Sequence, residues 1–306
     1  MTRWPGVPVL AILVTATLLR FCEPLAAQIL NSEPARPLNL FQKIARASLV
    51  VDVIVHDGTL RFAVVDVRQA LKGTPPAPRL RIAFRDYNYN RPPGVEPIVL
   101  PNGQEEVLFL VPDKQVRQKE KNRDIFELYL GQEGRIMVPA EGSRTFLEAL
   151  HRLVDLSTKD PASQIEGLNG LLASDNPYLL TTALDEVDRL RAGTPALYGR
   201  LTALLESPAS SVRARSLGLL REIFSGVAVS ASHDSLPDQA ESTLSAVLER
   251  ARNDGSEEVR VQAVTALAAW PVRSQVEGDL KAIAGQDPAQ SVRYEAQRAL
   301  LAPGRP

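Results

Sequence analysis

The period of apolar and polar positions changes along the chain and divides it into five parts. Residues 1–27 hold one long apolar run. Over residues 41–142 apolar residues recur at every second position, as in strands with one wet face. Over residues 143–302 they recur every three or four positions, as in helices. Residues 28–40 contain prolines and show neither period, so we predict an irregular segment there and a disordered tail at 303–306.

The β-region opens with the clearest hairpin signal of the chain. Residues 47–56 and 59–71 are rich in β-branched side chains, and Asp57-Gly58 between them favours a tight turn. A long proline-containing excursion at residues 85–104 interrupts the series. Six short antiparallel strands with one excursion predict a small barrel or sandwich. The four later strands are predicted at residues 79–84, 105–111, 125–130 and 135–138.

The order LVVDVIVHDG, FAVVDVRQALKG and EEVLFLV resembles the OB-like domain of the netrin/TIMP type found in exported bacterial proteins. The resemblance implies a small antiparallel OB-like β-barrel. Relatives of the TIMP kind reach a protease metal through an N-terminal cysteine. The single cysteine of this chain, Cys22, lies in the apolar run at the N-terminus, so protease inhibition does not carry over.

An aromatic loop within the excursion is a candidate recognition patch. Residues 86–90 read DYNYN, and we take Tyr87 and Tyr89 as candidate partner-binding residues. The plainer interpretation is turn chemistry, with the tyrosines lying against the wall of the barrel.

The helical region repeats itself. SPASSVRARSLGLL from Ser207, DGSEEVRVQAVTAL from Asp254 and DPAQSVRYEAQRAL from Asp287 share a turn residue, a Val-Arg pair and small or apolar residues four and eight positions after the valine. SDNPYLLTTALDEV, around Leu179, is a weaker first copy. A helix between successive copies carries leucine and valine at helical spacing. A pair of helices of about 33 residues cannot cover its own apolar stripe, so the copies predict a stack of pairs.

These features resemble HEAT repeats, including the phycobilisome-lyase-like variant, and imply an armadillo-type α-α superhelix. In HEAT proteins an aspartate in the turn and an arginine six residues later form a ladder between neighbouring repeats. Ser207 replaces the aspartate of one copy, and Leu180 replaces the arginine of the first copy. We interpret the ladder as structural, fixing the register between repeats. Its residues are Arg213, Asp254, Arg260, Asp287 and Arg293.

Residues suited to catalysis are few. The carboxylate pairs Glu105-Glu106 and Glu257-Glu258 fit a strand entry and a first helical turn. The chain has no Gly-x-Ser-x-Gly elbow, Walker loop or Gly-x-Gly-x-x-Gly. We therefore predict that the protein is not an enzyme and has no catalytic, cofactor or metal site. Three histidines lie far apart without metal-ligand spacing, namely His56, His151 and His233.

Charge limits the partners. A formal net charge of −1 lacks the basic footprint that nucleic acid or an anionic membrane surface demands. We predict that the helical surface, together with loops of the β-region, binds or scaffolds a protein partner. Arg215, Gln262 and Gln297 are candidate contacts, and plain solubility is their simpler role. A lyase-type or other enzyme-associated protein and a structural envelope module are the alternatives.

The N-terminus has the layout of a secretory signal peptide. Arg3 is followed by an apolar stretch, Val7–Leu19, and by the small-residue exit Leu25-Ala26-Ala27. The stretch has 13 residues, whereas a spanning helix needs about 20. We predict cleavage near Ala27, a mature chain without a transmembrane segment, and a periplasmic or extracellular location. An uncleaved anchor is the alternative.

Overall fold

The computed structural model describes residues 38–90, 93–112, 125–129, 131–230 and 239–301. The predicted signal peptide, the tail and His233 lie outside the described residues. From Asn39 onward the described residues belong to one unit. Among them, no helix combines the length and the apolar character that crossing a bilayer requires.

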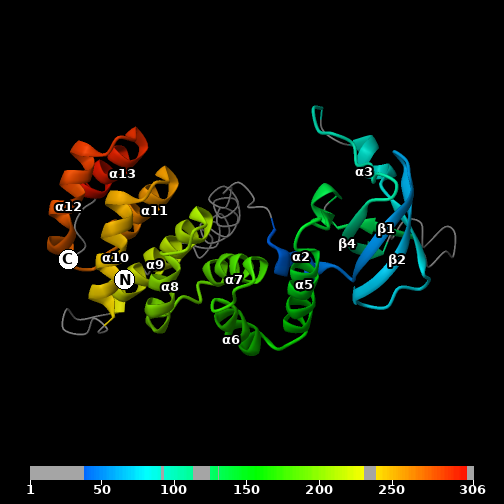
Figure 1. The fold of residues 1–306 in the computed structure, drawn as a ribbon, viewed down its shortest axis with the longest axis horizontal. Helices are drawn as coiled ribbons and strands as arrows, with labels where there is room; N and C mark the ends of the chain where they lie inside the picture. Colours follow the sequence, from blue (N-terminus) through cyan, green and yellow to red (C-terminus); the bar gives the residue numbers. More distant parts are fainter. Residues whose placement is uncertain (1–37, 91–92, 113–124, 130, 231–238, 302–306) are drawn as a thin grey trace, which may run out of the picture. The chain divides into compact units, whose positions relative to one another are not determined.

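The N-terminal half of the described chain forms a small closed β-barrel. Its strands are β1 (Leu49–Gly58), β2 (Phe62–Lys72), β3 (Arg79–Ala83), β4 (Glu105–Pro112), β5 (Ile125–Leu128) and β6 (Arg135–Met137). They pair in the order β1-β2-β3-β5-β4, and β4 returns to pair with β1, which closes the ring (Figure 1). The short β6 lies along β4 outside the ring. A β-barrel followed by helices is the predicted architecture.

One pairing differs from the expected antiparallel pattern. β3 and β5 run parallel, with Arg81 opposite Ile125. Parallel neighbours need a long connection rather than a tight turn. Here the connection contains a short helix, α3 (Arg85–Asn90), and the whole of β4. The excursion at 85–104, expected to be a loop, therefore holds a helix and helps to bring the two parallel strands together.

Alternate residues of the strands enter two different cores. Inward side chains of β1, such as Val51 and Val53, are buried with Leu108 of β4 inside the barrel. Outward side chains such as Val50 and Phe109 are buried in a second core that they share with the helices. Because both faces of these strands are covered, their sequences are almost continuously apolar.

The excursion is fixed to the barrel by Asn88. Its amide nitrogen donates to the main-chain oxygens of Leu60, at 2.7 Å, and Ile98, at 2.9 Å. Its Oδ1 accepts from the N–H of Ile98 at 2.7 Å. Asn88 is buried, so these bonds satisfy an amide that would otherwise cost free energy to bury. The DYNYN segment is therefore anchored by an asparagine rather than by a tyrosine.

A helix that the sequence analysis did not predict, α2 (Leu40–Arg46), precedes the barrel. The residues were expected to be irregular up to 40 and β-structured from 41. Instead Asn39 and Gln42 form a capping box, in which each side chain accepts from the other's main-chain N–H, at 2.9 and 3.2 Å. The buried Phe41 and Ile44 join the core shared with the helices.

Both ends of α2 are held by residues distant in sequence. At its C-terminal end, the Nζ of Lys72 donates to the main-chain oxygens of Ile44, Ala45 and Ala47, at 2.7, 3.1 and 2.8 Å. At its N-terminal end, the Nδ2 of Asn39 donates to Glu186 at 2.6 Å, a residue 147 positions later. Helix α2 therefore connects β2 to the helical half of the chain.

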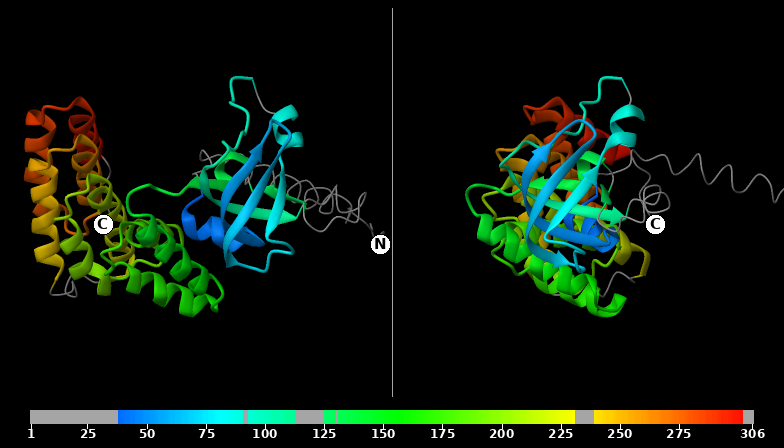
Figure 2. Two further views of the ribbon diagram at one scale, coloured as in Figure 1. Left: turned by 45° about the vertical axis from the view of Figure 1, so that its right-hand side comes forward. Right: turned by 90° about the vertical axis from the view of Figure 1, so that its right-hand side faces the viewer.

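The helical half is a series of paired helices. They are α5 (Ser143–Ser157), α6 (Pro161–Leu171), α7 (Pro177–Arg189), α8 (Tyr198–Leu204), α9 (Ser210–Ser230), α10 (Ala240–Asn253), α11 (Glu257–Ala268), α12 (Arg273–Gln286) and α13 (Gln290–Leu301). The pairs α6–α7, α8–α9, α10–α11 and α12–α13 pack together, as the sequence copies predict (Figure 2). Helix α9 continues past Val227, where a loop was expected.

Successive pairs stack through one layer in particular. Helices α7, α9, α11 and α13 contact one another in series, and we call them the Val-Arg layer. The positions zero, four and eight after the valine of α11, namely Val259, Ala263 and Leu267, are all 0% exposed. A small side chain at the middle position lets neighbouring helices approach closely, as expected for stacked repeats.

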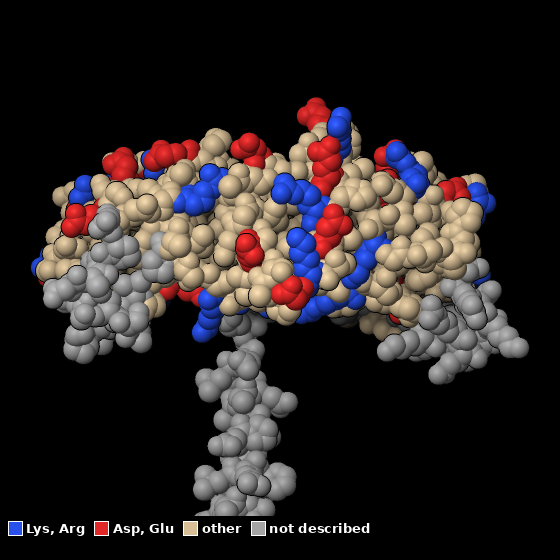
Figure 3. Space-filling view, turned by 90° about the horizontal axis from the view of Figure 1, so that it is seen from below, with Lys and Arg blue, Asp and Glu red and all other residues tan. Residues whose placement is uncertain are grey.

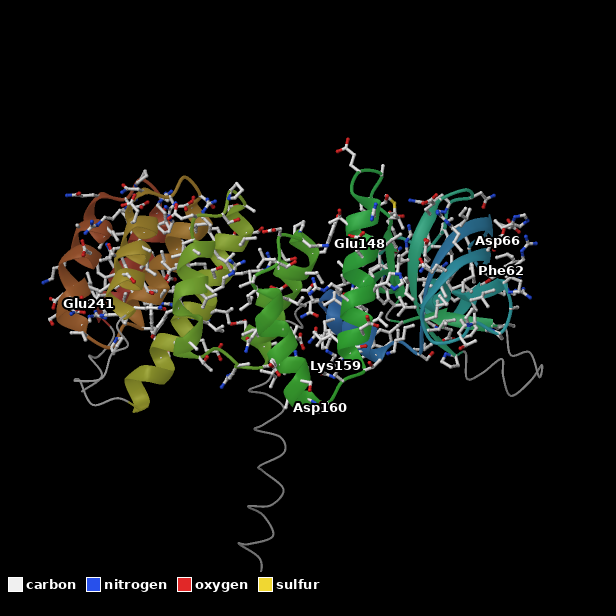
Figure 4. All side chains as sticks on the ribbon, turned by 60° about the horizontal axis from the view of Figure 1, so that its bottom comes forward. Phe62, Asp66, Glu148, Lys159, Asp160 and Glu241 are labelled. Atoms are coloured by element: carbon white, nitrogen blue, oxygen red, sulfur yellow. The ribbon has the colours of Figure 1, made fainter. Side chains whose placement is uncertain are left out.

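We expect Lys72→Met to lower the free energy of unfolding by about 1–3 kcal/mol, because it leaves carbonyl oxygens at the end of α2 without a donor. Urea unfolding of the purified protein measures the effect. Lys159→Met is the matched control, since Lys159 is an exposed lysine at the turn between α5 and α6 (Figure 4). Equal stability of the two variants would contradict a capping role for Lys72.

Candidate protein-binding surface

Two arginines of the Val-Arg layer bind aspartates of the following pair. Arg213 of α9 donates through Nε and Nη2 to both carboxylate oxygens of Asp254, each at 2.8 Å. Arg260 of α11 binds Asp287 in the same way, at 2.9 and 3.2 Å. We call each of these two-pronged pairs a rung. The guanidinium and carboxylate are both planar, so a rung fixes orientation as well as distance.

The interval of six residues in the sequence reflects a different bond. The Nη1 of Arg213 donates to the main-chain oxygen of Ser207 at 2.7 Å, and Arg260 and Arg293 donate likewise to Asp254 and Asp287, at 2.8 and 2.6 Å. Each arginine thus closes the turn of its own pair with Nη1 and reaches the next pair with its other edge. A main-chain oxygen suffices for the first bond, which explains why Ser207 is tolerated.

Each rung aspartate also organises the turn that it occupies. Oδ1 of Asp254 accepts from the N–H of Ser256 at 2.9 Å, and Oδ1 of Asp287 accepts from the N–H of Ala289 at 2.8 Å. These bonds satisfy main-chain donors at the start of the following helix. Burial alone would raise the pKa of Asp254, but the hydrogen bonds from Arg213 and Ser256 outweigh it and lower the pKa below its usual value.

The ladder has one interruption, at the junction between α7 and α9. Because rungs cross between pairs, Leu180 and Ser207 stand at the two ends of the same missing rung. A different pair bridges this junction, in which Nε of Arg215 donates to Oδ1 of Asp185 at 2.5 Å. Its side chains are 40% and 36% exposed, against 13% and 1% for Arg213 and Asp254. Exposure to solvent makes the substitute pair weaker than a rung.

The predicted contact residues occupy different positions in the repeat. Arg215 and Gln262 both stand three residues after the valine, and both are at least partly exposed. Gln297 stands five residues after it, where Leu217 and Val264 of the preceding copies are buried. The structure therefore groups Arg215 with Gln262, and places Gln297 on the outer side of the last described pair.

The two tyrosines of the excursion lie in α3. Tyr89 is 67% exposed and makes an additional interaction within the molecule. The backbone of Tyr87 is helical. Because Asn88 between them is anchored in the barrel, Tyr89 is presented from a fixed helix rather than from a loop.

The outward side of the Val-Arg layer was not recognised from the sequence. Helical spacing places the second, sixth and ninth residues after the valine on the side opposite the core. In α9 and α11 these positions include Gly218, Val261, Thr265 and Ala268, which are all partly or fully exposed and uncharged. We call these four residues the outward strip. Their spacing was available in the repeated copies, but only the buried positions were used.

Cations on the outside of the barrel are matched within the molecule. Arg79 pairs with Asp66 at 2.6 Å, and the guanidinium of Arg81 lies 4.1 Å from the centre of the Phe62 ring. Phe62 and Asp66 are neighbours along β2 (Figure 4). On the face drawn in Figure 3, basic and acidic side chains are interspersed. Neither observation marks out an anion-binding surface.

Inside the barrel, Glu106 is 0% exposed. Burial raises the pKa of its carboxyl group, and Arg135, whose Nη2 lies 3.1 Å from Oε1, acts in the opposite direction. His56 lies 3.6 Å from Asp66, and His151 lies 3.0 Å from the side chain of Gln69. Over the described ranges, no group of three or more histidine, cysteine or acidic residues is placed to hold a metal ion.

Comparisons with known proteins give two distant structural similarities. No protein-family model matches the chain, and no curated protein matches it. The crystal structure of an engineered protein is 19% identical over 51% of this chain and 74% of that one, with a TM-score of 0.35. The complex of CpcE and CpcF of phycocyanin lyase from Nostoc sp. PCC7120 is 13% identical over 50% of this chain and 98% of that one, with a TM-score of 0.37. At these values neither similarity assigns a role to a residue of this chain.

One expectation is corrected by these comparisons. The prediction that the protein is not an enzyme is wrong, because it rested on absent motifs alone, and one of the two similar structures comes from a lyase. Scattered histidines and the lack of a nucleophile elbow do not decide the matter. The description that follows therefore concerns binding and leaves catalysis open.

We expect Asp287→Ala to cost about 3 kcal/mol of unfolding free energy, because it leaves the guanidinium of Arg260 partly buried without a carboxylate. Asp185→Ala removes the exposed pair at the interrupted junction and should cost less than about 1 kcal/mol. Chemical unfolding of the two variants side by side measures the difference. Comparable losses would show that the rungs do not dominate the stacking.

The contribution of Asp254 should depend on pH. Its pKa is lowered in the folded protein, so its stabilising effect is complete above the unfolded value of about 3.9 and disappears as pH falls through the lower, folded value. The stability gap between the native protein and Asp254→Asn should therefore narrow below about pH 4. Urea midpoints between pH 7 and pH 2.5 test this. Asp185→Asn is the control, because burial raises the pKa of Asp185 and no such gap should close.

Proposed function

We propose that this protein binds a protein partner across the Val-Arg layer, with the outward strip at the centre of the contact. The observation that carries the proposal is the composition of the strip, Gly218, Val261, Thr265 and Ala268, on helices that could present long charged side chains to solvent at no steric cost. Charged residues are depleted from the centres of protein interfaces and common on ordinary surfaces. Small side chains also let a partner approach the helix backbone closely.

The border of the strip supplies polar groups suited to orientation. On one side lie Arg215, in its exposed pair with Asp185, and Gln262. On the other side Tyr294 of α13 is 61% exposed. Tyrosine and arginine are enriched among residues that dominate binding energy. This arrangement, a low apolar centre with a polar and aromatic rim, supports a protein rather than a small molecule as the ligand.

The rungs support the proposal by making the surface rigid. Arg213 and Arg260 fix the rotation of α9 and α11 relative to the next pair, so the strip keeps its shape before the partner arrives. A surface ordered in advance loses less conformational entropy on binding. The function is therefore one of holding a partner in a defined orientation.

We expect Thr265→Arg to weaken partner binding by at least about tenfold, because a long charged side chain at the centre of the strip blocks close approach. Ser245→Arg on α10 is the matched control, since Ser245 is exposed on another helix, outside the strip. The measurement is retention of copurifying protein by each tagged full-length variant at matched expression. Equal retention by both variants would exclude the strip as the binding surface.

We propose further that the partner is met outside the cytoplasm, on the basis of the N-terminal residues alone. Arg3, the run Val7–Leu19 and Ala27 have the order of a cleavable leader. The mass of the protein recovered from cells that express the full chain should correspond to a first residue directly after Ala27. A mass that includes Met1, with the protein in the cytoplasmic fraction, would contradict this part of the proposal.

A further inference from the structure

Arg293 repeats one half of a rung and lacks the other. Its Nη1 donates to the main-chain oxygens of Asp287 and Pro288, at 2.6 and 3.0 Å, as Arg213 does to Ser207 and Pro208, at 2.7 and 3.1 Å. The Nε and Nη2 edge, which binds a carboxylate in both rungs, has no carboxylate partner among the described residues. The guanidinium is therefore held in position by one edge while the other edge is available.

The two complete rungs define what this edge accepts. In each, the carboxylate belongs to an aspartate whose Oδ1 also accepts the main-chain N–H two residues later, at the start of a helix. That double role fixes the carboxylate plane, so that it meets the guanidinium with both oxygens. The matching group is an aspartate in the turn before a helix.

The surface around Arg293 indicates how permanent such a contact is. Tyr294 and Leu301 of the same helix are 61% and 84% exposed, which offers apolar contact beside the charge. Gln297, in contrast, stands where the preceding copies bury Leu217 and Val264. Obligate interfaces are more apolar than transient ones, so a polar residue at this position favours a reversible contact.

A second copy of this chain fits the site poorly. The two turn aspartates of the described repeats, Asp254 and Asp287, are already engaged in rungs. At the equivalent position the first copy has Ser174, and the next has Ser207. A head-to-tail stack of identical chains would therefore meet Arg293 with a serine. The occupant has to come from a different protein.

We propose that the outer side of α12–α13 is a second interaction surface, on which Arg293 captures a turn aspartate from a helix pair of another protein. The Nε and Nη2 groups donate to its carboxylate, and Tyr294 and Leu301 contact the helix that follows. The surface lies at the end of the repeats, outside the outward strip, so the partner bound here is additional to the one proposed for the strip.

The test supplies the missing helix pair within the same chain. A copy of residues 269–301 is inserted directly after Leu301, with residues 302–306 following the copy. The copied Asp287 then follows Arg293 at the interval of 27 residues that separates Arg260 from Asp287. Linking the pair to the site raises its effective concentration to about the millimolar range, enough to detect a weak contact. Hydrogen exchange of the inserted helices reports docking.

Amide protection in the inserted pair should fall by about tenfold or more when its aspartate is changed to asparagine, since a hydrogen bond to a charged group is lost. Arg293→Lys should have a similar effect, because lysine keeps the charge but loses the two-pronged geometry. Arg298→Lys is the control, as Arg298 is exposed and pairs with Glu295 of its own helix. Protection that is unchanged by the asparagine substitution would overturn the proposal.

Two further outcomes separate this inference from the others. Sedimentation of the native protein should show no concentration-dependent dimer. A dimer that Arg293→Lys abolishes would assign the site to a second copy and refute a foreign occupant. Thr265→Arg in the extended chain should leave protection of the inserted pair unchanged, so failure at α13 and failure at the outward strip are distinguishable.

Discussion

The bidentate bond between an arginine of one helix pair and the aspartate that opens the next determines how the helical half is built. Apolar stripes on stacked pairs are nonspecific about rotation, because leucine and valine pack almost equally well over a range of angles. A planar guanidinium facing a planar carboxylate tolerates much less variation. Arg213 and Arg260 therefore convert a general tendency to stack into one register, and the alignment of the outward strip follows from that register.

The sequence predicts those parts of the fold whose causes are local. The β1–β2 hairpin is specified by its own turn, and the paired helices are specified by the copies around each Val-Arg. Helix α2 has a local signal too, the Asn39 and Gln42 capping box, but seven residues form a marginal helix in isolation. Its existence depends on Lys72 and Glu186, and no pattern within 40–46 refers to them. The parallel pairing of β3 with β5 is likewise the product of barrel closure.

The candidate site was visible in the sequence as an inventory and hidden as a geometry. The interval of six residues identifies the correct arginines, but it describes the bond from Nη1 to the main chain of the same turn. The carboxylate partner is 41 residues away for Arg213 and 27 for Arg260. This distance varies with the length of the intervening helices, so it leaves no fixed spacing. The outward strip was missed for another reason: small residues in a repeat suggest close packing until a structure shows that they face outward.

Helix α2 has a consequence for the order in which the molecule can be completed. It is the first described helix to be synthesised, yet the carboxylate that holds its N-terminal end arrives 147 residues later. At a translation rate of about 5–20 residues per second, Asn39 waits several seconds or more for Glu186. During that interval the barrel can close on its own short-range contacts, while Phe41 and Ile44 lack part of their final cover. The earliest segment of the chain is thus among the last to reach its native surroundings.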